Sequence, residues 1–120
     1  MSKPRKAVVF IAGPMTGYPN FNRDEFNTEA GILEEHGFTV LNPAILPDGL
    51  QHGQYLDITL AMLAQADAIF LLDGWEKSKG ATRECDEAGR LGLLVIYQSW
   101  ESLQKFIERK TGAVLEVLSD

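Results

Sequence analysis

This sequence of 120 residues has little cysteine, little histidine and no long hydrophobic run. Its single cysteine, Cys85, excludes an internal disulfide framework and is typical of a protein kept in a reducing compartment. Its two histidines, His36 and His52, have no ligand-like spacing, so we predict no metal site. No apolar run approaches the ~20 residues that cross a bilayer. We therefore expect a cytoplasmic protein with no membrane partner, in which Cys85 packs in the core and His52 is solvated.

Positive charge is also scarce, since 11 Lys and Arg against 17 Asp and Glu give a formal net charge of −6. That balance argues against a surface for polymeric nucleic acid, although amides and one local basic residue can still hold a single phosphate. Five prolines spread along the chain and a hydrophobic content of 45% argue against disorder. The length predicts one domain, residues 1–120, with a single core.

The most informative stretch runs from Asp67 to Tyr97. An apolar run at 68–72 predicts a buried strand, a polar loop with glycine follows at 73–80, and a helical pattern leads to a second apolar run at 93–97. Strand, loop, helix and strand form a crossover unit, which implies parallel pairing and a right-handed connection. Ligands bind beyond the carboxyl ends of parallel strands, so the loop 73–80 is expected to face the site.

Within this unit, the segment Ser78–Glu84 reads Ser-Lys-Gly-Ala-Thr-Arg-Glu. The amides of Ser78, Gly80 and Ala81 would stand free at the start of a helix, where an anion is favoured. Glu84 would lie about one turn further, and the helix N-terminus favours its ionised form. An ionised carboxylate at this place can attack an electrophilic sugar carbon. From this segment alone, a residue that merely improves the helix start is an equally weighted interpretation.

Upstream, the apolar run 7–12 predicts a first, central strand. The loop that follows it, 13–20, lacks the spacing of a P-loop or of a dinucleotide fingerprint. Its length and its place after a strand still favour a cradle for a polar ligand over a plain connection. The loop 42–54 is rich in proline and glycine, and we expect it to be partly mobile and able to cover the site.

The remaining pattern alternates helices and strands. Asn22–Glu25 resembles a capping box, which would begin a helix there. Near the other end of the sequence, the segment 113–118 fits either a fifth strand or a tail. Together the elements predict a three-layer α/β domain with a four- to five-stranded parallel sheet. Helices are expected at 22–36, at 55–66 and from a cap at Ser99 to about Lys110, with a strand at 38–41.

Several motifs carry a family likeness. Phe10-Ile-Ala-Gly-Pro-Met, the late Asp67 and Ser78-x-Gly-Ala-x-x-Glu84, with Pro-Asn-Phe-Asn and Asn-Pro-Ala between them, resemble the nucleoside 2-deoxyribosyltransferase superfamily. In particular they resemble its small DUF4406 branch, often found in phages and bacteria, over residues 7–97. The resemblance implies a flavodoxin-like (Rossmann-like) fold and a homodimer or larger homo-oligomer. It also implies cleavage of the N-glycosidic bond of a 2-deoxynucleoside or its 5′-monophosphate.

The resemblance further implies roles for single residues. The family uses a glutamate nucleophile that forms a covalent deoxyribosyl intermediate, and Glu84 occupies that position. Family loops after the first and third strands bind sugar and phosphate, which points to Gly13, Met15, Ser78 and Gly80. Hydrogen bonds or charge could also come from Thr16, Tyr18, Ala81 and Arg83.

One departure concerns the acid that assists the leaving base. The family usually places an aspartate eight residues before the position of Asp67, and here Thr59 stands there. We therefore consider Asp57 and Asp73 as candidate acids. Nothing beyond fold analogy suggests a flavin, so no cofactor is expected.

Two functions stay open. The first is an enzyme of nucleotide metabolism, a glycosidase that acts as hydrolase or transferase through Glu84. The second is a non-catalytic nucleotide-binding or sensing domain, which the absent aspartate favours. In either case Trp100, Phe106 and the helix 55–66 offer more apolar surface than one sheet covers, which predicts a homodimer or larger assembly.

Overall fold

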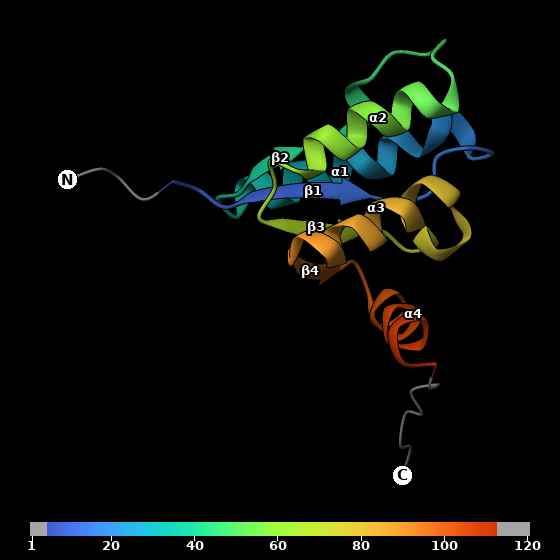
Figure 1. Cartoon of the computed structure of the whole chain (residues 1–120). Coiled ribbons are helices and arrows are strands. Elements are labelled where there is room, and N and C mark those ends of the chain that lie inside the picture. Colours follow the sequence, from blue (N-terminus) through green and yellow to red (C-terminus); the bar gives the residue numbers. More distant parts are fainter. Residues whose placement is uncertain (1–4, 113–120) are drawn as a thin grey trace.

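The computed structural model describes residues 5–112, which form a parallel four-stranded sheet with helices on both faces (Figure 1). The strand order is β2-β1-β3-β4, and each neighbouring pair is parallel. This is the order of the first four strands in a flavodoxin-like sheet, so the predicted fold class is confirmed. The strands are β1 (Val8–Ala12), β2 (Thr39–Leu41), β3 (Ala68–Leu71) and β4 (Leu94–Tyr97).

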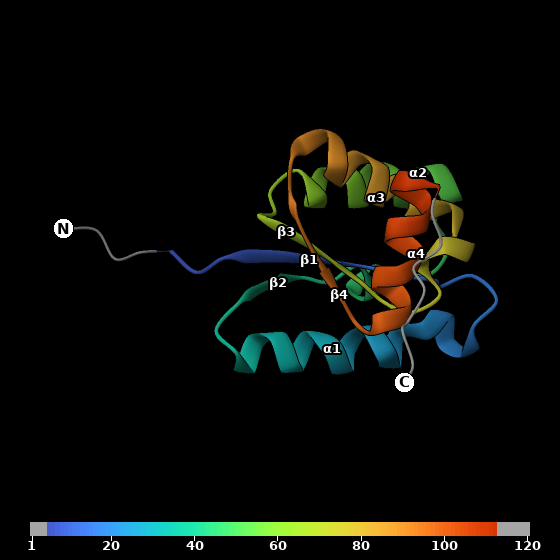
Figure 2. The same cartoon turned by 90° about the horizontal axis from the view of Figure 1, so that it is seen from below.

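Helices make the outer layers. One face of the sheet is covered by α1 (Arg23–Glu35), and the opposite face by α2 (His52–Leu63) and α3 (Lys79–Leu91), as Figure 2 shows. In α1 the buried residues Phe26, Ala30 and Leu33 recur at helical spacing, which makes one apolar stripe against the sheet.

The two central strands form the floor of both cores. Side chains alternate along β1, so that Val9 and Ile11 pack toward α1 while Phe10 and Ala12 pack toward α2 and α3. All of β3 is buried as well. A strand covered on both faces needs an apolar residue at every position, which is why the runs at 7–12 and 68–72 predicted these two strands.

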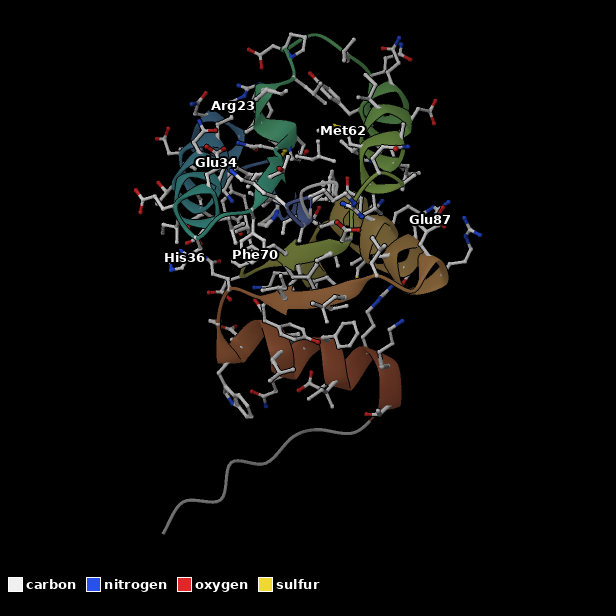
Figure 3. The ribbon with its side chains drawn as sticks, turned by 90° about the vertical axis from the view of Figure 1, so that its left-hand side faces the viewer. Arg23, Glu34, His36, Met62, Phe70 and Glu87 are labelled. Carbon is white, nitrogen blue, oxygen red and sulfur yellow. The ribbon has the colours of Figure 1, made fainter. Side chains whose placement is uncertain are left out.

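The last helix, α4 (Trp100–Thr111), crosses the outer edge of β4 from the α1 layer to the α3 layer (Figures 2 and 3). At its start Gln98 donates to Glu25 of α1 at 2.5 Å, and at its end Arg109 pairs with Asp86 of α3 at 2.6 Å. Between them the rings of Tyr97 and Phe106 meet edge to face at 5.6 Å. None of the helices within residues 5–112 has the length and apolar character to cross a bilayer.

Two expectations at element ends differ from the structure, and a third falls outside the described residues. The helix predicted from 55 begins at His52 instead, because the Gln54 side chain accepts the Gln51 N–H at 2.9 Å and so caps an earlier start. The capping box at 22–25 is wrong: Asn22 has φ 62°, and its side chain donates to the Pro14 carbonyl at 2.9 Å. The segment 113–118 lies outside the described residues.

Candidate functional site

A cavity of about 330 Å³ opens at the carboxyl ends of the strands. It lies where the strand order reverses between β1 and β3, the place at which parallel α/β sheets bind ligands. Its walls come from the loop after β1, the segment after β2, the first turns of α2 and the start of α3. The cavity therefore lies at the edge of the sheet where the loops 13–20 and 73–80 predicted a site.

Glu84 is the buried carboxyl group of this cavity. It lies on the cavity wall with 7% of its surface exposed. Burial raises the pKa of Glu84 from 4.5 to about 7, against a hydrogen bond from Thr59 that lowers it. The sequence predicted that the helix N-terminus would favour ionisation. That effect fades beyond the first turn, and loss of water dominates at this depth.

The start of α3 is capped from within. The Ser78 hydroxyl accepts the Ala81 N–H at 3.1 Å, and the Ser78 N–H donates to the Trp75 carbonyl at 3.0 Å. Two of the three amides expected to be free are therefore engaged. The first intrahelical bond runs from Thr82 to Ser78, so the amides of Lys79 and Gly80 precede it. An anion at this end would meet these two amides.

The other predicted substrate-binding residues surround the same opening. Gly13 lines the cavity, and a Cβ there would lie 2.7 Å from the Leu72 Cβ, so only glycine lets the first loop pass so close to β3. Tyr18 does not line the cavity but borders a neighbouring depression, the outer hollow, together with Lys77 and Lys79. The cavity itself is lined by the remaining candidates, Met15, Thr16, Ser78, Gly80 and Ala81.

Neither aspartate considered as the acid lines the cavity. Asp57 is exposed on α2. The Asp73 carboxylate turns instead to the start of α4, where it accepts hydrogen bonds from the hydroxyls of Ser99 and Ser102. Thr59, at the position where the resemblance implies an aspartate, is buried and does line the cavity. Arg83, considered as a source of charge, is exposed and 4.0 Å from Glu87.

An ion pair that the sequence did not reveal forms part of the cavity wall. Arg23, the first residue of α1, pairs with Asp48 at 2.7 Å, and both line the cavity. The Tyr55 hydroxyl donates to the Pro47 carbonyl and so holds the same segment from the side of α2. These contacts hold the segment after β2 against the cavity. This segment belongs to the loop 42–54, which was expected from the sequence to cover the site.

Left-handed backbone stands beside this wall. Asn20, Phe21 and Asn22 have φ of 50°, 54° and 62°. Asparagine tolerates this conformation, whereas for Phe21 it costs about 1–2 kcal/mol, and such strain concentrates at ligand sites. The turn places Phe21, 46% exposed, on the cavity wall, with the Arg23 guanidinium 5.2 Å from the centre of its ring.

His52 also reaches the site. It is exposed, as predicted for a solvated residue, yet it lines both the cavity and the outer hollow. Its Cε1 atom lies 3.8 Å from the position of a Cβ on Gly80, so the imidazole stands over the start of α3. The sequence predicted a loop at His52, whereas the structure makes it the first residue of α2.

The chain is similar to a protein family and to a solved enzyme structure. Residues 7–97 match the family described as "Domain of unknown function (DUF4406)". No curated protein matched the chain. Among solved structures, the chain is similar to a 2-desoxiribosyltransferase from Leishmania mexicana, with a TM-score of 0.62 and 19% identity. The match covers 76% of this chain and 63% of that one, so it demonstrates a shared fold over part of the longer enzyme.

Proposed function

The chain belongs to the DUF4406 family and has a nucleoside 2-deoxyribosyltransferase-like fold. From this premise we propose that it cleaves the N-glycosidic bond of a 2-deoxynucleoside or its 5′-monophosphate and passes the deoxyribosyl group to water or to a second base. The observation that carries the proposal is Glu84, a buried carboxyl group on the wall of a cavity at the topological switch point. Keeping a carboxyl group away from water is costly, and such groups concentrate at functional sites.

The reaction is a double displacement like that of retaining glycosidases. The Glu84 carboxylate attacks C1′ of the deoxyribose, the bond from C1′ to the base nitrogen breaks, and the base takes up a proton. Water or a second base then attacks C1′ and releases the carboxylate. The Thr59 hydroxyl favours the ionised form of Glu84, which is the nucleophilic one.

The cavity suits a ligand of this size. Its volume of about 330 Å³ is at the lower end of small-molecule sites. Apolar side chains line much of it, among them Met15, Phe26 and Leu56, and these fit the faces of a base and a sugar. The amides of Lys79 and Gly80, with the lysines of the outer hollow, support a phosphate beside the sugar. Nucleoside and monophosphate are therefore both candidate substrates.

A panel of 2-deoxynucleosides and their monophosphates, followed for free base, tests the proposal. The wild type should release base from at least one of them. Glu84→Gln should reduce that release by several orders of magnitude, because an amide cannot form the covalent ester. Glu87→Gln is the matched control, since it removes the same charge from the outer side of α3 (Figure 3) and should change the rate little. Equal rates in wild type and Glu84→Gln would refute the nucleophile.

The second candidate is a non-catalytic nucleotide-binding or sensing domain. It is favoured by Thr59 at the position of the family's aspartate and by the absence of Asp57 and Asp73 from the cavity wall. Such a domain would show nucleotide-dependent thermal stabilisation and release no base from any member of the panel.

A further inference from the structure

We propose that His52 is the proton donor to the leaving base. This assignment rests on the proposed function. It fills the role of general acid, for which Asp57 and Asp73 are poorly placed because neither lines the cavity. Departure of a base is assisted by a proton, and imidazole is the side chain that most readily gives and takes one near neutral pH.

The other ionisable side chains of the cavity are already committed. Asp48 is held in its ion pair with Arg23, and the Tyr55 hydroxyl donates to the Pro47 carbonyl. Glu84 is the nucleophile. By contrast, within residues 5–112 no hydrogen bond engages the ring of His52, so both of its nitrogens can meet a ligand.

The position of His52 relative to Glu84 suits the role. Its ring is in reach of Gly80, and Gly80 and Glu84 lie four residues apart on the same face of α3. One turn of helix is about 5 Å along the axis. The ring and the Glu84 carboxyl group therefore line the same cavity, one from α2 and the other from the next turn of α3. A deoxyribosyl group between α2 and α3 would have Glu84 on one side of C1′ and His52 on the side of the leaving base.

The proton balance closes with these two residues. In the first step a ring N–H of His52 passes its proton to the base as the bond to C1′ breaks, and C1′ bonds to a Glu84 oxygen. In the second step His52, now lacking that proton, accepts one from water as the water oxygen bonds to C1′. The ester bond breaks, and the Glu84 carboxylate and the protonated ring are restored.

The experiment compares leaving groups. Each variant is assayed with the best natural substrate of the panel and with the 4-nitrophenyl 2-deoxyriboside of matching phosphorylation, whose phenolate leaves without a proton. His52→Gln should slow release of the natural base by about 10²- to 10⁴-fold and change release of nitrophenolate by less than about 3-fold. The second histidine provides the control: His36→Gln alters the end of α1 that leads into β2 (Figure 3), away from the carboxyl ends of the strands, and should alter neither rate.

Three results would overturn the assignment. Equal slowing of both substrates would mean that His52 holds the sugar or phosphate, and no slowing would mean that it only faces solvent. A wild type that releases neither leaving group would overturn the proposed function together with this assignment. Failure of His52 alone is recognised because Glu84→Gln would still abolish release of both leaving groups while His52→Gln would not discriminate between them.

Discussion

Replacing Glu84 with glutamine should stabilise the protein in a pH-dependent way. The folded-state pKa of Glu84 is about 7, against 4.5 for an ordinary glutamate. Below pH 4.5 the carboxyl group is protonated in both the folded and the unfolded chain and costs nothing. Above about 7 it is ionised in both, and the folded state bears the full cost of a buried charge. This difference between the folded and unfolded pKa values corresponds to about 3 kcal/mol of unfolding free energy, which the wild type loses as the pH rises.

Urea unfolding of wild type and Glu84→Gln between about pH 5 and about pH 8 measures this cost. Subtracting the two free energies of unfolding cancels all the other titrating groups. The difference should favour the variant increasingly with pH, by up to about 3 kcal/mol near pH 8.

Glu87→Gln provides the contrast. Its partner Arg90, 2.6 Å away, lowers the pKa of Glu87, so its contribution is lost only as the pH falls below the ordinary value of a glutamate. Between about pH 5 and about pH 8 its difference curve should therefore be flat. A flat curve for Glu84→Gln as well, or one that favours the wild type as the pH rises, would refute the buried-carboxyl argument.

Three further outcomes follow from the same structure. A nucleoside monophosphate should raise the melting temperature more than its nucleoside, because the amides of Lys79 and Gly80 can bind the added anion; equal shifts would contradict a phosphate site. Asp73→Asn should cost about 1 kcal/mol of stability, because the hydroxyls of Ser99 and Ser102 lose a charged acceptor, and leave base release almost unchanged; slower release at full stability would make Asp73 the acid. Sedimentation at micromolar concentration should show a homodimer or larger species, since Trp100 is 52% and Leu94 68% exposed; monomer alone would count against it.

The sequence predicts the strands and the place of the cavity well, for local reasons. A short apolar run bounded by turn residues favours a strand buried on both faces, and this pattern identified β1 and β3. Turn residues after β1 and β3 then put two loops at one edge of the sheet. The motif from Ser78 to Glu84 needed only helical spacing to bring its carboxyl group to that edge.

What the sequence could not predict depends on contacts between distant segments. Arg23 and Asp48 pair across 25 positions, and nothing in either segment indicates its partner. Asp73 was considered as the acid, but its carboxylate accepts hydrogen bonds from Ser99 and Ser102 at the start of α4. For Glu84, helical spacing gave the position but not the loss of water, which reversed the expected direction of its pKa.

The central claim, that Glu84 becomes covalently bonded to the sugar, is tested most directly by mass spectrometry of the intact protein quenched in acid during turnover. We predict a mass gain of one deoxyribosyl unit, carried after proteolysis by the peptide that contains Glu84, and no gain in Glu84→Gln. Base release by the wild type without such a gain, or with the sugar on a different residue, would contradict the account.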